Sequence, residues 1–107
     1  MFRKKGTAAT RQLMEGVHLT TLVNGDKTLM GQISIVKGSV IPPHDHPHEQ
    51  TGFMLSGKLR LKVENEEQEV EPGDSWCIPG GAEHSATALE DSVVIEVFSP
   101  VREDYLP

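Results

Sequence analysis

Three histidines at alternate positions, His44, His46 and His48, are the residues of this chain best suited to chemistry. Residues i and i+2 of an extended segment point to the same side, so His44 and His46 can bind one ion from a single strand end. Imidazole is the commonest nitrogen ligand for transition metals, but two imidazoles alone hold any of them weakly. A second segment must supply further ligands, and we expect His84 as the third and Gln50 as the fourth. The plainer hypothesis is that the histidine-rich segment is only a polar loop.

The remaining histidines are weaker ligand candidates. Pro47 interrupts the extended segment before His48, so we expect His48 at the rim of the site. His18 lies in a predicted strand without a visible partner, and we expect it on a wall or at the surface. Glu49 has the opposite parity to Gln50 and should point away from the metal.

One carboxylate, Glu96, interrupts the most apolar stretch of the chain. By strand parity Glu96 shares a face with Val94 and Phe98. A buried carboxylate is compensated when a cation is near, so we expect this face to point inward, toward the metal. The outward face then carries the alternate apolar residues Val93, Ile95 and Val97. That stripe needs a cover, and a second copy of the chain is the simplest one, so we expect a homodimer.

Four further side chains have roles that the sequence suggests but does not decide. Trp76, the only tryptophan, is expected either to line a cavity or to belong to the plain core. Arg102 is the better of two arginines to bind a substrate carboxylate, because Arg60 lies on the polar face of an alternating strand. Cys77 is expected to be a small buried apolar group.

Short alternating runs separated by turn residues must position these candidates. The predicted strands are residues 16–23, 29–36, 50–55, 58–64, 68–70, 75–78, 84–88 and 92–98. Residues 7–14 are expected to hold a helical turn. Eight short strands joined by tight turns predict an all-β protein, an antiparallel sandwich or barrel. The length of 107 residues predicts a single domain over 1–107, with a flexible N-terminal arm over 1–12.

Composition and charge exclude several function classes. The formal net charge of −6 is unfavourable for binding a phosphate backbone. No apolar run approaches the roughly 18 residues of a membrane span, and residues 1–14 lack the apolar stretch of a signal peptide. The single cysteine cannot form an intramolecular disulfide. We therefore expect a cytoplasmic protein that binds neither nucleic acid nor membrane.

Two longer motifs resemble the conserved motifs of the cupin superfamily. The first is Gly38, five residues, His44-Asp45-His46, three residues, Gln50, six residues and Gly57. The second is Gly73, five residues and Pro79-Gly80-Gly81-Ala82-Glu83-His84. The chain departs from the family at Gln50, where cupins usually have Glu, and at Ala88, where they have Asn. The resemblance implies a cupin-type double-stranded β-helix, or jelly-roll, barrel with a metal held inside by His44, His46, Gln50 and His84.

The change from Glu to Gln at position 50 has an electrostatic consequence. Three neutral imidazoles and a neutral amide leave a divalent ion at +2, whereas a carboxylate ligand would leave +1. We expect a stronger Lewis acid that is held less tightly and that favours a small anionic substrate. Four protein ligands leave open positions, as in catalytic sites. One divalent transition metal is predicted, and Ni, Fe, Mn, Zn or Co all suit these ligands.

Three segments also resemble the KdgF-type pectin-degradation cupins: residues 44–50, 73–79 and 89–105. This resemblance implies a metal-dependent enzyme of isomerase or lyase type that converts 4,5-unsaturated uronates into linear keto-aldehydes. The family's pocket carboxylate, phenylalanine and arginine fall on Glu96, Phe98 and Arg102, which the resemblance makes the catalytic candidates. The family's carboxylate is typically Asp, so Glu96 is a departure.

Two other functions stay open at this point. A three-histidine metal site also suits a dioxygenase that acts on a small enediol or a flavonol. A non-catalytic module that binds a small metabolite is the third hypothesis.

Overall fold

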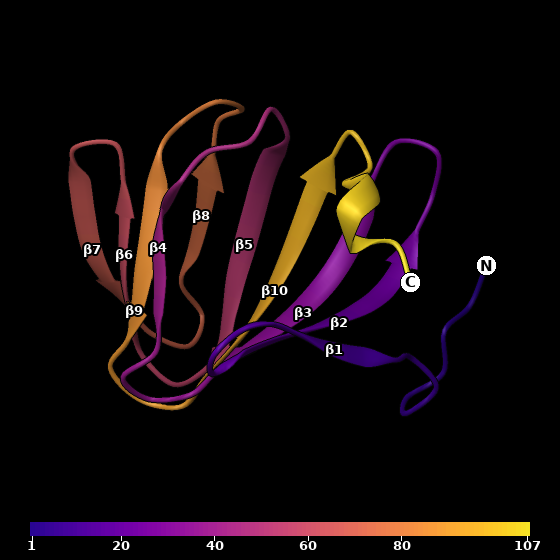
Figure 1. The fold of residues 1–107 in the computed structure, drawn as a ribbon, viewed down its shortest axis with the longest axis horizontal. Coiled ribbons are helices and arrows are strands. Elements are labelled where there is room, and N and C mark those ends of the chain that lie inside the picture. Colours follow the sequence, from indigo (N-terminus) through magenta and orange to yellow (C-terminus); the bar gives the residue numbers. More distant parts are fainter.

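Ten strands form two antiparallel sheets that face each other across a shared interior (Figure 1). The computed structural model describes residues 1–107. The six-stranded sheet has the order β1 (Thr10–Met14), β2 (Val17–Asn24), β3 (Leu29–Ile35), β10 (Ser92–Ser99), β5 (Glu49–Ser56) and β8 (Ser75–Ile78). The four-stranded sheet has the order β4 (Val40–His44), β9 (His84–Ala88), β6 (Leu59–Val63) and β7 (Glu66–Val70). A short 3-10 helix, η1 (Glu103–Tyr105), follows β10.

The core lies between the two sheets because most strands alternate apolar and polar residues. In β6, Leu59 and Leu61 are buried while Arg60 is exposed. The main buried cluster draws on both sheets and consists of Val17, Leu19, Ile33, Ile35, Met54, Leu59, Leu61, Val70, Ala86, Ala88 and Val94. The predicted all-β jelly-roll class is confirmed.

Two local predictions were wrong. The helical turn expected over residues 7–14 is absent, and β1 instead pairs antiparallel with β2 from Thr10 onward. The last three residues of the expected arm over 1–12 therefore belong to this strand. The strand β4 lies outside the predicted set because Pro42 and Pro43 cannot donate to a ladder. It forms at the edge of its sheet, with a register shift where the prolines lie, which is where strands tolerate proline.

The parity expected for β10 is correct. Val94, Glu96 and Phe98 are 2%, 6% and 1% exposed, whereas the alternate residues are half-buried on the outer face. Across the outer face, Ile95 pairs with Phe53 of β5, which is exposed. The outer face of the six-stranded sheet thus carries an apolar stripe.

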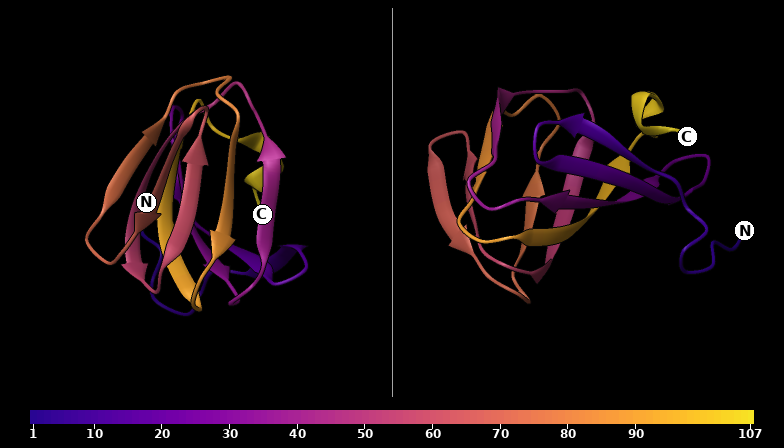
Figure 2. Two further views of the ribbon diagram at one scale, coloured as in Figure 1. Left: turned by 90° about the vertical axis from the view of Figure 1, so that its left-hand side faces the viewer. Right: turned by 60° about the horizontal axis from the view of Figure 1, so that its bottom comes forward.

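Cys77 is exposed, which corrects the expectation that it is buried. Neighbouring strand residues point to opposite sides, and Trp76 takes the inner side of β8. Cys77 takes the outer face of the six-stranded sheet, where Phe53 of the neighbouring β5 is exposed as well. The strands of both sheets run between tight turns, and the two termini lie on the side of β1 to β3 (Figure 2). The molecule contains no helix of the length and apolarity that crossing a membrane takes.

Candidate metal centre

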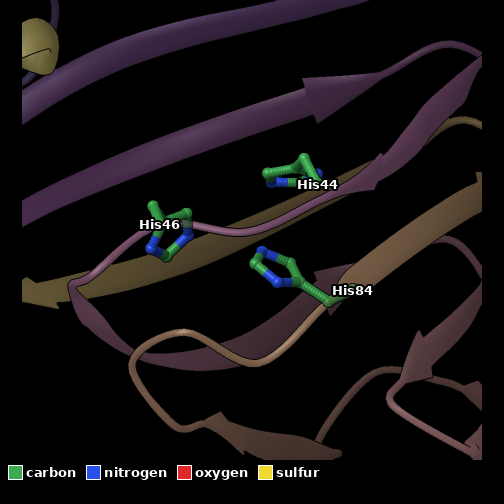
Figure 3. A group of neighbouring side chains, drawn as sticks. All are labelled: His44, His46 and His84. Carbon is green, nitrogen blue, oxygen red and sulfur yellow. The ribbon is translucent and has the colours of Figure 1, made fainter.

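The pairing of β4 with β9 brings the two halves of the predicted metal site together. His44, the last residue of β4, is the cross-strand partner of His84, the first residue of β9. His46 lies two residues beyond β4, and Gln50 is the second residue of β5. The ligating nitrogens of the three histidines all lie within 4.8 Å of one another, and their rings turn toward one another (Figure 3).

Close backbone contact holds the two histidine-bearing loops in place. The backbone N–H of Gly81 donates to the carbonyl oxygen of His46 at 2.8 Å. A Cβ at Gly80 would lie 2.4 Å from the carbonyl oxygen of Pro47, so only glycine fits at that position. The glycines of the second motif therefore let the loop before β9 approach the loop after β4.

Each of the three rings is oriented by a backbone carbonyl two residues away. The Nδ1 contacts are His44 with Pro42 at 2.9 Å, His46 with His48 at 3.1 Å and His84 with Ala82 at 2.9 Å. A carbonyl oxygen only accepts, so Nδ1 carries the proton and donates. The other ring nitrogen, Nε2, then carries the lone pair that a metal requires.

The position of Gln50 tests whether a cation fits this site. Its Oε1 lies 3.0 Å from Nε2 of His46, and the Gln50 side chain is buried. A neutral imidazole has one N–H, so it cannot donate both to Gln50 and to the His48 carbonyl. With the proton on Nδ1 and the Gln50 amide oxygen turned toward His46, two lone pairs face each other at Nε2 and Oε1. A shared cation resolves that opposition, so the donor set fits a metal held by His44, His46, Gln50 and His84.

The protonation state of the histidines supports the same fit. Burial lowers the pKa of His46, and the positive charge of Arg102 lowers it further. Burial also lowers the pKa of His84, against the raising effect of its hydrogen bond with the Ala82 carbonyl. Both rings are therefore neutral at pH 7, which is the form that binds a metal.

Glu96 lies on the inner face of β10 and is 6% exposed. Its cross-strand partners are both glycines, Gly31 on β3 and Gly52 on β5, so no neighbouring Cβ crowds the carboxyl group in its row. Burial raises the pKa of Glu96 to about 8, while Gln50, Trp76 and Arg102 each lower it in part. A divalent cation beside Gln50 would favour the ionised form further. The structure thus places a carboxyl group inside the barrel beside one of the candidate ligands.

Phe98 and Arg102 lie beside this carboxyl group. Phe98 is 1% exposed, and its ring centroid lies 6.0 Å from that of His46. The guanidinium carbon of Arg102 lies 3.9 Å from the ring centroid of Tyr105 and 5.2 Å from that of Phe98. The Tyr105 backbone carbonyl accepts a hydrogen bond from Thr21 of β2. The segment after β10 is thus attached to the six-stranded sheet and holds Arg102 over two aromatic rings.

Except for His46, these side chains line one cavity of about 190 Å³ between the sheets. The polar lining consists of His44, Gln50, His84, Ser85, Glu96, Arg102 and Tyr105, and the remaining lining is mainly apolar. This volume is below the roughly 300–1,000 Å³ of pockets for drug-sized ligands, so the cavity suits a molecule of about one ring.

The other candidates lie outside the histidine cluster. His48 is half-buried, with its ring centroid 5.5 Å from that of His46, and it does not belong to the cluster. His18 is half-buried between two inward residues of β2. Arg60 is exposed and forms ion pairs with Glu67 and Glu69, as expected for a solvent-facing residue.

The sequence did not single out Tyr105, which packs on Arg102, or the indole N–H of Trp76 as a polar group of the site. The only signal for Tyr105 was its place inside the segment that resembles the KdgF-type cupins. Its contact with Arg102 depends on the turn at η1, and no hydrophobic periodicity in the sequence predicts that turn.

Residues 31–99 match the Cupin domain family. The pectin degradation protein KdgF of Dickeya dadantii is 29% identical over 97 residues, which is 89% of this chain and 88% of that protein. The solved structure of KdgF from a Halomonas species has a TM-score of 0.93 and 30% identity, covering 99% of this chain and 100% of the other.

A RmlC-like cupin from Shewanella frigidimarina also has a TM-score of 0.93, at 24% identity, covering 98% of this chain and 95% of that one. At that identity the likeness shows the fold alone. The family match spans both histidine motifs, and the KdgF likeness extends over almost the whole chain. With its three-histidine site positioned to bind a metal, this chain belongs to the cupin family and is of the KdgF type.

Proposed function

We propose that this protein is a metal-dependent enzyme that converts 4,5-unsaturated uronates into linear keto-aldehydes. The observation that carries the proposal is the buried carboxyl group of Glu96 beside Gln50, in a cavity that is also lined by His44, His84 and Arg102. Two proteins similar to this chain over most of its length are named KdgF, and one is named for pectin degradation. Pectin is a polymer of uronates, so the likeness favours this substrate class.

The donor set defines what a bound metal would contribute. His44, His46, His84 and Gln50 would hold one divalent transition metal, with Ni, Fe, Mn, Zn and Co as the candidates. Such an ion acts as a Lewis acid and polarises a substrate oxygen. With four neutral ligands it also favours an anionic substrate.

Glu96 would move the proton in this reaction. Its carboxylate takes the proton from the anomeric hydroxyl at C1, the bond between C1 and the ring oxygen breaks, and C1 becomes the aldehyde carbon. The former ring oxygen stays on C5 as an enolate. Glu96 then returns the proton to C4, and C5 becomes a ketone. Atoms and charge balance, because the proton that leaves one site arrives at the other, and such general acid–base transfer contributes typically 10²–10⁴-fold.

Arg102 and Phe98 would position the substrate. The Arg102 side chain, at 14% exposure, lies over the rings of Phe98 and Tyr105, which limits its rotation. A guanidinium held in this way can form paired hydrogen bonds with the uronate carboxylate. Phe98, fully buried beside His46, would exclude water from the same end of the cavity.

The test is turnover of unsaturated galacturonate by metal-loaded protein, with the product identified by NMR. We expect loss of the absorbance of the unsaturated bond and formation of the keto-aldehyde, at a rate above the uncatalysed reaction and strongly reduced by Glu96→Gln. Exposed Glu49→Gln is the matched control and should keep the wild-type rate. Oxygen consumption with a flavonol, or saturable binding of the uronate without product, would contradict the proposal and favour the dioxygenase or the binding module.

A further inference from the structure

Three residues on neighbouring strands form one row across the inner face of the six-stranded sheet. Trp76 of β8 pairs with Gly52 of β5, and Gly52 pairs with Glu96 of β10. A Cβ at position 52 would lie 2.1 Å from Nε1 of Trp76 and 2.2 Å from the adjacent ring carbon. The indole therefore lies across the glycine, in the space that any other side chain would fill, and its N–H edge extends along the row toward Glu96.

Two polar atoms of this row are buried and have no hydrogen-bond partner: Nε1 of Trp76 and Oε2 of Glu96. They are complementary, because an indole N–H only donates and a carboxylate oxygen only accepts. Trp76 lowers the pKa of Glu96 as a hydrogen-bond donor does, so its N–H faces the carboxyl group, but Nε1 and Oε2 do not reach full hydrogen-bond geometry. Buried polar groups are nearly always paired, and both of these residues line the cavity. A third group that bonds to both atoms would complete the pair.

We propose that Trp76 and Glu96 form a subsite for one substrate hydroxyl group, which accepts from the indole N–H and donates to the carboxylate. Of the common substrate groups, a hydroxyl both donates and accepts through one atom. A carboxylate or a carbonyl cannot donate to Glu96, and an ammonium group cannot accept from Trp76. The subsite thus selects a hydroxylated substrate and fixes the position of one of its oxygens.

The identity of that hydroxyl rests on the proposed function. The hydroxyl whose proton Glu96 removes is the anomeric one, so the anomeric oxygen would occupy this subsite. The indole N–H would keep its hydrogen bond as the C1–OH group becomes an aldehyde, because a carbonyl oxygen also accepts. Trp76 then binds the reacting oxygen in both substrate and product, while Glu96 gives and receives the proton.

The first test measures binding rather than turnover. The probe is D-galacturonate, a saturated uronate that carries the anomeric hydroxyl but has no double bond with which to react. Because Trp76 is the only tryptophan, the intrinsic fluorescence of metal-loaded protein reports on the subsite directly. We expect a saturable fluorescence change with galacturonate. No saturable binding of galacturonate to the wild type would overturn the assignment.

The second test compares two ligands and two variants by calorimetry. For Trp76→Phe, which keeps an aromatic face but lacks the N–H, we expect the affinity for galacturonate to fall about tenfold, the effect of one such hydrogen bond. The 1-deoxy analogue, which lacks the anomeric hydroxyl, should bind wild type and Trp76→Phe equally. Cys77→Ser, on the opposite side of the same strand, is the matched control and should bind both ligands as the wild type does.

The outcomes separate this proposal from the proposed function. If Trp76→Phe weakens the binding of galacturonate and of the 1-deoxy analogue equally, the indole only fills space or holds solvent. That result would overturn the subsite even if the enzyme turns over unsaturated uronates. Hydroxyl-dependent weakening without any turnover would support the subsite and refute the proposed reaction. Gly52→Ala adds a check that keeps the tryptophan: by displacing the indole it should reproduce the loss of hydroxyl recognition, and unchanged recognition would contradict the geometry.

Discussion

The pH dependence of folding stability gives the sharpest test of the buried carboxyl group of Glu96. Burial raises its pKa from 4.5 to about 8 in the metal-free protein. In the unfolded chain the group ionises near its ordinary value. Between pH 4.5 and pH 8 the folded state keeps a proton on Glu96 that the unfolded state releases. The contribution of Glu96 to the free energy of unfolding is therefore fully present below pH 4.5, and it is lost as the pH rises through 8. The full loss corresponds to about 5 kcal/mol.

The perturbation is Glu96→Gln, which keeps the side-chain volume and removes the titration. In chelator-treated protein, wild type and variant should have similar free energies of unfolding at pH 4.5, and the variant should become progressively more stable above it. The difference should approach about 5 kcal/mol at pH 9, as the upper limit. His46 and His84, whose pKa values burial lowers, destabilise both proteins equally as the pH falls below 6.5.

Urea denaturation at pH 5, 7 and 9 measures these differences. The exposed Glu49→Gln should change the free energy of unfolding by no more than about 0.5 kcal/mol at each pH. Loading wild type with a divalent metal should reduce the difference at pH 9, because a nearby cation stabilises the ionised carboxylate. A difference between wild type and Glu96→Gln that stays constant from pH 5 to 9 would refute the burial argument.

The same variant tests the catalytic role. Glu96→Gln should keep the fold and the metal but lose about 10²-fold or more in turnover, the usual contribution of general acid–base catalysis. More than about half of wild-type turnover at full metal loading would end the proton-transfer proposal.

The remaining predictions concern the metal ligands and the outer sheet face. His84→Ala should reduce the metal content found by elemental analysis, and full stoichiometry with full affinity would show that His84 is not a ligand. Gln50→Glu should tighten metal binding and lower turnover, because a carboxylate reduces the net charge of the site; unchanged affinity together with unchanged turnover would show that Gln50 does not contact the metal. We further propose that the apolar outer stripe around Phe53 and Ile95 joins two copies of the chain. Sedimentation should then show a dimer that Ile95→Lys dissociates, and a monomeric wild type would contradict this.

Local chemistry was enough to predict eight of the ten strands, because a period of two needs no long-range information. The alternation around Leu59 and Leu61 predicted a half-buried strand, and the parity of Val94 and Phe98 predicted that Glu96 points inward. The spacing of His44 and His46 likewise predicted two metal ligands from one segment. The predictions of strands and faces are confirmed because each compares residues one or two positions apart.

The packing of the two sheets decided what that local pattern could not. Strand β4 exists because β9 pairs with it at an edge where prolines are tolerated, and that pairing sets His44 against His84. Parity could state only that Trp76 and Cys77 point apart, and the packing of one sheet face against the other sheet decided that Trp76 lines the cavity and Cys77 meets solvent. The unpaired atoms of Trp76 and Glu96 follow from the register of three strands that are distant in the chain. Contacts between distant segments depend on how whole sheets align, and no short window of residues contains that alignment.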